Sequence, residues 1–229
     1  MDNKKDKHLY NEDSIESLDP LQFTRLRPQV YAGDCTYSTQ LLVEIISNAV
    51  DEYLNGHCTE CEIVVEENGR ILIQDNGRGV PFGKAEDGSE TLVNVYTKLH
   101  TGAKFDSSGK TGYNTSGGMN GVGAKATNAL SKQFTVVSIR DGKKAVAEFV
   151  KGELVTYKES KVASNETGTC VSFIPDEEIF KEGIRLDYNA LKKQIQELAY
   201  LSPGMRFRLK YENNPEEEIT SKNGIRDYI

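Results

Sequence analysis

The chain has 229 residues, of which 37% are hydrophobic and 28% charged, a composition typical of one folded globular domain. The formal net charge of −7 argues against a basic surface that would grip DNA by its phosphates. No apolar run approaches the roughly 18–20 residues that cross a bilayer. The polar start MDNKKDKHLYNEDS also lacks the apolar stretch of a signal peptide, so we expect a cytoplasmic protein with no membrane partner.

The first part of the chain combines helices with a strand pair. Residues 1–16 are predicted to be a flexible polar arm, and residues 17–229 one folded domain. SIESLDPLQFTRLRP has a helical pattern that ends before Pro28, and TQLLVEIISNAVDEYLNG has helical spacing that stops at Gly56. CEIVVEE and RILIQDNG are typical of two strands around a turn at Asn68-Gly69.

The second part is richer in strands. ETLVNVYTKLH predicts a short helix, a glycine-rich stretch follows it, and VGAKATNALS predicts another helix. Four strand-like runs come next, QFTVVSIR, KAVAEFV, GELVTYK and TCVSFIP, then a helix (DYNALKKQIQELAYL), a strand (MRFRLKY) and a short turn. Because this order is no regular βαβ alternation, it predicts an α+β two-layer sandwich with one mixed β-sheet and helices on one face.

Two glycine-containing stretches compete as a phosphate site. Gly109-Lys110-Thr111 would need a glycine at position 104 and a preceding strand to complete a Walker loop, but Lys104 stands there after a helical run. Gly121-x-Gly123-x-x-Ala126 lacks the strand that a Rossmann fingerprint must follow. What remains is a loop whose glycines run into a helix N-terminus and suit an anion, with a ligand-free surface loop as the alternative.

The helix predicted over residues 39–55 has two distinct faces. Glu44, Asn48 and Asp51 fall within an arc of about 60° on one of them. A solvated face is the alternative, but such faces normally mix charge signs, and residues 38–56 contain no Lys or Arg. Carboxylates and an amide without cations suit Mg²⁺ and an activated water. The opposite, apolar face consists of Leu42, Ile45, Ile46, Ala49, Val50 and Tyr53.

The cysteines offer a weaker signal. Cys58 and Cys61 form a C-x-x-C, but Cys35, Cys170 and three scattered histidines supply no second ligand pair at zinc-site spacing. We therefore expect ordinary reduced thiols.

Four segments resemble, in order, the nucleotide-binding motifs of the GHKL ATPases: VEIISNAVDE, QDNGRGVP, TSGGMNGVGAKATNALS and ETGTCVSFIPD. More narrowly, YNEDSIESLDPLQFTRLRP, KLHTGAKFD and NALS resemble the ATPase segment of the B subunit of bacterial type II topoisomerases, either DNA gyrase or topoisomerase IV. The resemblance covers nearly the whole chain from about Tyr10. It implies a Bergerat-type fold, with residues 17–229 as the ATP-binding domain and ATP and Mg²⁺ as ligands.

The resemblance also implies individual roles. Glu44 would be the general base that takes a proton from the attacking water, and Asn48 would bind Mg²⁺. Asp75 would accept a hydrogen bond from the adenine amino group, with Thr169 assisting through a water. Further nucleotide contacts would come from Asp51, Gly77, Arg78, Gly79, Pro81, Lys104, Gly117, Gly118, Met119, Asn120, Gly121, Val122, Gly123 and Arg140.

The implied function is ATP-gated dimerisation that drives DNA strand passage. Its partners would be a second copy of the B subunit, an A-type DNA-cleaving subunit, and DNA bound through other domains. The transducer and DNA-cleavage-associated domains are absent from this sequence, so weak ATP hydrolysis is expected of the chain alone. Two alternatives stay open: another GHKL ATPase (mismatch repair, Hsp90-type chaperone or histidine kinase), or a nucleotide-gated dimerisation module without turnover.

Overall fold

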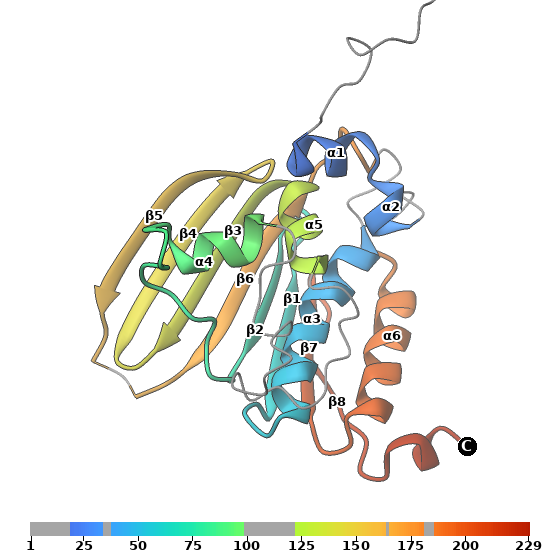
Figure 1. Cartoon of the computed structure of the whole chain (residues 1–229). Coiled ribbons are helices and arrows are strands. Elements are labelled where there is room, and N and C mark those ends of the chain that lie inside the picture. The colour runs from blue at the N-terminus through green and yellow to red at the C-terminus, as the bar shows by residue number, and fades with distance from the viewer. Residues whose placement is uncertain (1–18, 34–37, 99–121, 164, 181–185) are drawn as a thin grey trace, which may run out of the picture.

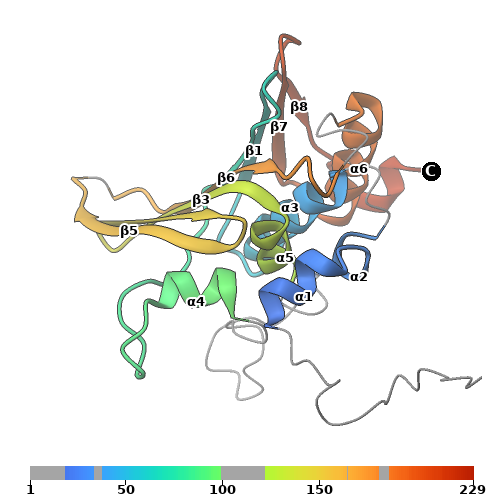
Figure 2. The ribbon, with the colours of Figure 1, turned by 90° about the horizontal axis from the view of Figure 1, so that it is seen from above.

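The computed structural model describes residues 19–33, 38–98, 122–163, 165–180 and 186–229. Its strands form one eight-stranded sheet in the order β5-β4-β3-β6-β2-β1-β7-β8. The β1–β7 pair is parallel, and its other pairs are antiparallel, so the sheet is mixed. The helices lie on one face of this twisted sheet, as Figures 1 and 2 show, and the predicted α+β sandwich is confirmed.

The helices are α1 (Pro20–Leu26), α2 (Gln29–Ala32), α3 (Thr39–Leu54), α4 (Thr91–Thr97), α5 (Gly123–Ala129) and α6 (Tyr188–Leu201), with a 3-10 helix at Gly224–Asp227. The strands are β1 (Glu60–Val65), β2 (Ile71–Asp75), β3 (Ser131–Arg140), β4 (Lys143–Val150), β5 (Glu153–Lys161), β6 (Gly168–Pro175), β7 (Arg206–Tyr211) and β8 (Glu217–Ile219).

Local sequence explains where several elements start and turn. Asp19 caps α1, because its carboxylate accepts from Leu21 N at 3.1 Å, and Pro20 occupies the first helical turn. The β1–β2 turn has Gly69 at φ 82°, a conformation that favours glycine, which confirms the predicted hairpin. Two short elements were not predicted, α2 and β8, because four residues after a proline and three mostly charged residues carry no periodic pattern.

The core lies between the sheet and the helices. Phe134 of β3 is its aromatic centre, with ring centroids 5.4 Å from Tyr96 and 6.0 Å from Phe149. The apolar face of α3 is buried there as predicted, whereas β1 buries alternate residues. Helix α3 is therefore held firmly against the strands that end beside it.

Arg25 fastens α1 to the rest of the domain. Its guanidinium donates to Ala129 O at the end of α5 (2.7 Å) and to Asp176 Oδ2 after β6 (2.6 Å). Asp176 is only 1% exposed, and Lys151 approaches the same oxygen at 3.6 Å. A carboxylate this deeply buried depends on its partners, since an uncompensated buried charge is strongly destabilising.

We expect Arg25→Ala to lower the free energy of unfolding by about 2 kcal/mol, because the Asp176 carboxylate would keep only the more distant Lys151 ammonium and one backbone N–H, that of Glu178 at 3.1 Å, among the described residues. The matched control is Lys132→Ala, which removes an exposed ion pair with Glu177 and should change stability little. Urea unfolding of both variants checks this. Equal stability of the two variants would show that the α1 anchor contributes nothing.

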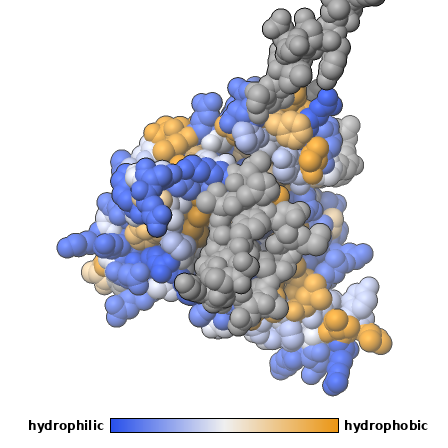
Figure 3. Space-filling model, viewed as in Figure 1, coloured by the Kyte–Doolittle hydropathy of each residue, from blue (hydrophilic) through white to orange (hydrophobic). Residues whose placement is uncertain are grey.

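Outside the grey atoms, the surface visible in Figure 3 is mostly hydrophilic, with separate hydrophobic groups at the upper left, near α1–α2 and near the C-terminus. The exposed apolar side chains of the group near α1–α2 are Phe23, Leu26 and Val30. Within the described ranges, none of the helices has the length and apolar character needed to cross a bilayer.

Candidate functional site

Asp75 ends β2 with its carboxylate turned back into the protein. Oδ1 accepts hydrogen bonds from Gly77 N (2.8 Å) and Thr169 N (3.2 Å). Burial raises the pKa of Asp75 to about 6, and nearby Glu52 adds to the rise, although the two N–H donors oppose it. Because both donors use Oδ1, Oδ2 is the oxygen left to accept from a ligand.

Glu52 of α3 holds the turn after β2 from the helix side. Its Oε2 accepts from both Arg78 N and Arg78 Nε at 3.1 Å, and its Oε1 accepts from Arg78 Nη2 at 2.8 Å. The carboxylate thus binds the backbone and the side chain of the same residue. These hydrogen bonds fix the direction of the turn relative to α3, and the Arg78 guanidinium lies at the edge of the turn.

The strands hold the same turn from the other side. Val80 N donates to Thr169 Oγ1 (3.3 Å), and Ser138 Oγ donates to Val80 O (2.7 Å). Arg140 Nη1 donates to Gly79 O at 3.3 Å. Since Ser138 and Thr169 are paired residues on β3 and β6, one residue of the turn is bound by hydroxyls of two neighbouring strands.

Two glycines make this close approach possible. Gly79 has φ 76°, and a Cβ there would meet Ile139 O and lie 3.0 Å from Ser138 Oγ. A Cβ on Gly77 would lie 3.0 Å from Asp75 Oδ1 and 3.1 Å from Glu52 Oε2. A side chain at Gly79 would therefore collide with β3, and one at Gly77 would crowd the Asp75 carboxylate, so both glycines let the turn lie close against its neighbours.

The polar face of α3 points away from the core at its other end. Glu44 is half-buried, and its Oε1 accepts from Gln40 Nε2 at 2.9 Å. Its Oε2 faces Gly123, the first residue of α5, where an added Cβ would lie only 2.6 Å from Glu44 Cδ. Asn48 is half-buried one turn further along α3.

Asp51 is not exposed to solvent, as a residue on a solvated helix face would be. It is 1% exposed and belongs to the buried residues of α3, a depth that the helical wheel did not predict. Glu44 and Glu52 are separated by about 12 Å along the helix axis. Helix α3 therefore connects two polar regions, one at Asp75 and one at Gly123.

The structure brings together part of the predicted set. Around Asp75 lie Gly77, Arg78, Gly79, Arg140 and Thr169, whereas Pro81 follows them as an exposed residue. Around Glu44 lie Asn48 and Gly123, with Val122 just before α5. The Gly109-Lys110-Thr111 stretch falls outside the described residues. So do the remaining predicted contacts, which are Lys104, Gly117, Gly118, Met119, Asn120 and Gly121.

Two residues of the site were not predicted. Glu52 escaped because it lies outside the arc that contains Glu44, Asn48 and Asp51. Ser138 had a usable signal, because residues two apart on a strand share a face and Ser138 stands two before Arg140.

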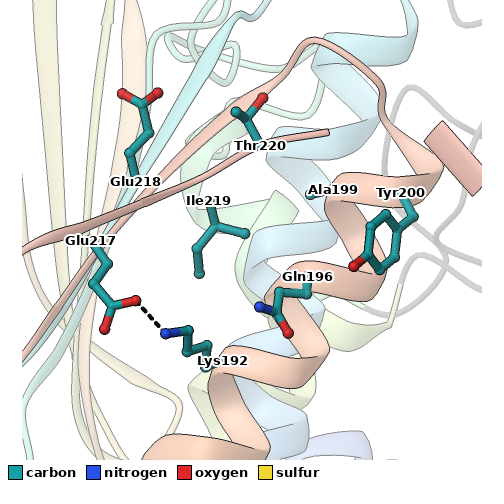
Figure 4. A pocket seen from close by; sticks show the side chains of 8 residues that line it. All are labelled: Lys192, Gln196, Ala199, Tyr200, Glu217, Glu218, Ile219 and Thr220. Atoms are coloured by element: carbon teal, nitrogen blue, oxygen red, sulfur yellow. Dashed lines mark ion pairs between the residues drawn. The ribbon is translucent and has the colours of Figure 1, made fainter. Parts of the chain in front are cut away.

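A separate cavity of about 280 Å³ lies between α6 and β8 (Figure 4). Its charged lining consists of Lys192, Glu217 and Glu218, and Lys192 pairs with Glu217. A net negative lining suits a triphosphate poorly. None of its lining residues belongs to the predicted nucleotide contacts.

No cluster of three or more His, Cys, Asp or Glu side chains with metal-binding geometry occurs among the described residues. The polar face of α3 still fits Mg²⁺, because that ion is commonly held by one or two protein oxygens together with substrate phosphates. Cys58 and Cys61 are buried, and burial raises the pKa of the Cys58 thiol to about 11. A thiolate at that position is therefore disfavoured.

Comparison with known proteins defines the class to which this arrangement belongs. The family described as "Histidine kinase-, DNA gyrase B-, and HSP90-like ATPase" matches residues 33–179, more than half of the chain. The chain is a member of this ATPase family. Helix α3, the turn after β2 and the start of α5 all fall within the matched residues.

Its relatives narrow the class to the B subunits of type II topoisomerases. The chain is 38% identical to the B subunit of DNA gyrase from Synechocystis, over 96% of the chain and 21% of that protein. It is 36% identical to the B subunit of DNA topoisomerase 4 from Enterococcus faecalis, over 99% of the chain and 33% of that protein. The chain therefore spans about a fifth to a third of the length of these relatives.

A solved structure confirms the fold. The 43K ATPase domain of Thermus thermophilus gyrase B, crystallised with an aminocoumarin, superposes with a TM-score of 0.77 and 32% sequence identity. The match covers 91% of this chain and 53% of that one. The predicted resemblance to the gyrase and topoisomerase IV ATPase segment is confirmed, and this interpretation is favoured over the other GHKL classes.

Proposed function

We propose that this chain binds ATP between α3 and the turn after β2 and hydrolyses it as part of a type II topoisomerase. The observation that carries the proposal is that α3 connects two polar regions, one at each end of the proposed site. The buried Asp75 carboxylate lies at one end, followed by a turn in which Gly79 has no room for a side chain and Gly77 has little, and Glu44 lies against Gly123 at the other end.

At the first end, adenine would be recognised by Asp75. Its Oδ2 would accept from the exocyclic amino group, and Thr169, whose hydroxyl already accepts from Val80 N, would donate to a bridging water. Arg78, Pro81 and Arg140 would border the base. Asp51 would contact the nucleotide from α3, deeper in the site.

At the second end, Glu44 would take the proton from the attacking water. Gln40 orients this carboxylate by donating to Oε1, so Oε2 is the oxygen available as the base. Asn48 would hold Mg²⁺, which when bound supplies charge neutralisation for the phosphates. Backbone groups from the stretch 117–123 and the Lys104 ammonium would complete the phosphate contacts.

Partners follow from the relatives named above. ATP binding would join two copies of the chain as a gate, and Phe23, Leu26 and Val30, exposed on α1–α2, would suit contact with a second copy. The A-type DNA-cleaving partner and DNA would be contacted by other parts of the protein, in the cytoplasm. Hydrolysis by this chain alone is expected to be slow. Positioning of the reacting groups supplies most of the rate in phosphoryl transfer, and a second copy and other parts of the protein would contribute to that positioning.

Calorimetry with a non-hydrolysable ATP analogue and Mg²⁺ tests the proposal. The chain should bind the analogue, Lys110→Ala should leave the affinity nearly unchanged, and Gly121→Val should abolish binding because a side chain would block the backbone's approach. Absence of binding by the unaltered chain would refute the proposal. Strong weakening by Lys110→Ala would instead move the phosphate site to the Gly109-Lys110-Thr111 stretch.

A further inference from the structure

Helix α5 is fastened to the two helices that flank it. Thr127 Oγ1 donates to Leu41 O of α3 (3.2 Å) and shares this bond with Gly123 O (3.0 Å). Asn128 Nδ2 donates to Tyr96 O, in the last turn of α4, at 3.0 Å. Because α5 begins with Gly123 against Glu44, the placement of α5 sets the space beside the proposed catalytic base.

Asn128 is an unusual choice for this interior position. It is 1% exposed, and its Oδ1 is buried without a hydrogen-bond partner among the described residues. A buried carbonyl left unpaired is costly, and an apolar side chain of similar shape would avoid that cost. The residue is therefore better explained by what its donor Nδ2 fixes than by its contribution to stability.

The acceptor of this bond is itself firmly held. Tyr96 is 4% exposed, and the centroid of its ring lies 5.4 Å from that of Phe134 in the sheet core. The hydrogen bond from Asn128 therefore fixes the position of α5 relative to α4, and α4 is packed against the core through Tyr96. The same bond also joins the two helices that bracket residues 98–122 of the chain, since α4 ends at Thr97 and α5 begins at Gly123.

We propose that Asn128 is a positioning residue for the triphosphate end of the site, acting through the placement of α5 relative to Glu44. This rests on the proposed function. The contact between Glu44 and Gly123 leaves no room for α5 to rotate or shift without disturbing the carboxylate. Among the described residues, the hydrogen bonds that hold the adenine end come from α3, β3 and β6 and none from α5, so a small shift of α5 should affect the adenine end less.

The test compares two ligands that differ in the phosphates. Calorimetry on the chain measures adenosine and a non-hydrolysable ATP analogue with Mg²⁺, using Asn128→Leu, which keeps the branched shape, and Asn128→Ala. Both variants should weaken analogue binding about tenfold while leaving adenosine binding within about twofold. The matched control is Ser131→Ala, which removes a buried hydroxyl that donates to Thr127 O of the preceding turn and should change neither affinity.

Thermal unfolding separates positioning from a general loss of structure. Asn128→Leu removes the unpaired carbonyl but also the donor to Tyr96 O, so its stability should stay close to that of the unaltered chain, and yet it should bind the analogue poorly. Equal weakening for both ligands, or no weakening for the analogue, would overturn the inference. Should the unaltered chain fail to bind the analogue, the proposed function itself would fall, an outcome distinct from either of these.

Discussion

Replacing Glu44 with Gln is expected to reduce the rate of ATP hydrolysis by about 10²–10⁴-fold while leaving ATP binding nearly intact. The substitution keeps the shape of the side chain and an oxygen to accept from Gln40 Nε2, so the local structure should survive. What disappears is the carboxylate oxygen beside Gly123 that would accept the proton of the attacking water. Single-turnover hydrolysis and analogue calorimetry on the same preparations separate chemistry from binding.

The control for this experiment is Glu153→Gln, an exposed carboxylate at the start of β5, on the outermost strand of the sheet. Glu153→Gln removes the same charge as Glu44→Gln and should change neither the rate of ATP hydrolysis nor the affinity for the analogue. Unchanged turnover in Glu44→Gln would show that another group is the base. Loss of binding along with turnover would assign Glu44 a role in holding the nucleotide.

Asp75→Asn should have opposite effects on stability and on binding. The rise of the Asp75 pKa from 3.8 to about 6 means that the ionised carboxylate costs the folded state up to about 3 kcal/mol at pH 7. An asparagine avoids this cost and can still accept from Gly77 N and Thr169 N through its oxygen. Its NH₂ group, however, would face the adenine amino group, so ATP affinity should fall at least tenfold.

The pH dependence gives a second signature of the same residue. Because the folded pKa is raised, the penalty is present above about pH 6 and is relieved as the pH falls toward 3.8, so the stability difference between the two proteins should shrink on acidification. ATP affinity of the unaltered chain should decline below about pH 6, when a proton on Oδ2 turns the acceptor into a donor. The variant should lack this decline. An unaltered chain whose affinity stays flat from about pH 7 to pH 5 would contradict the assignment of Asp75.

The sequence predicted the periodic elements well, because hydrophobic spacing reports directly on which face an element buries. Helix α3 and the strands from β1 to β7 were found for this reason. Periodicity says nothing of what packs against the polar face, and so the burial of Asp51 could not be foreseen. Glu52 could not either, since its role depends on a turn that arrives from β2.

The adenine end of the candidate site was predicted only through the order of four motifs. The QDNGRGVP stretch alone is compatible with a simple turn after a strand. The geometry proposed to recognise adenine depends on Ser138 and Thr169, which nothing within the QDNGRGVP stretch links to it. Where the motif occurs beside the other three in the right sequence order, the resemblance implies the part of Thr169 as well, whereas Ser138 was not predicted.

The way in which the turn after β2 is held bears on how the site comes into being. The backbone of residues 78–80 is bound by side chains that stand 26, 58, 61 and 89 positions away along the chain. Closing loops of that length costs entropy before any contact compensates for it, and local propensity offers no substitute. We therefore expect the proposed nucleotide site to form late in folding, once β6 lies between β2 and β3. A shorter piece of the chain that retains the motif but not that strand should not present Asp75 to a base.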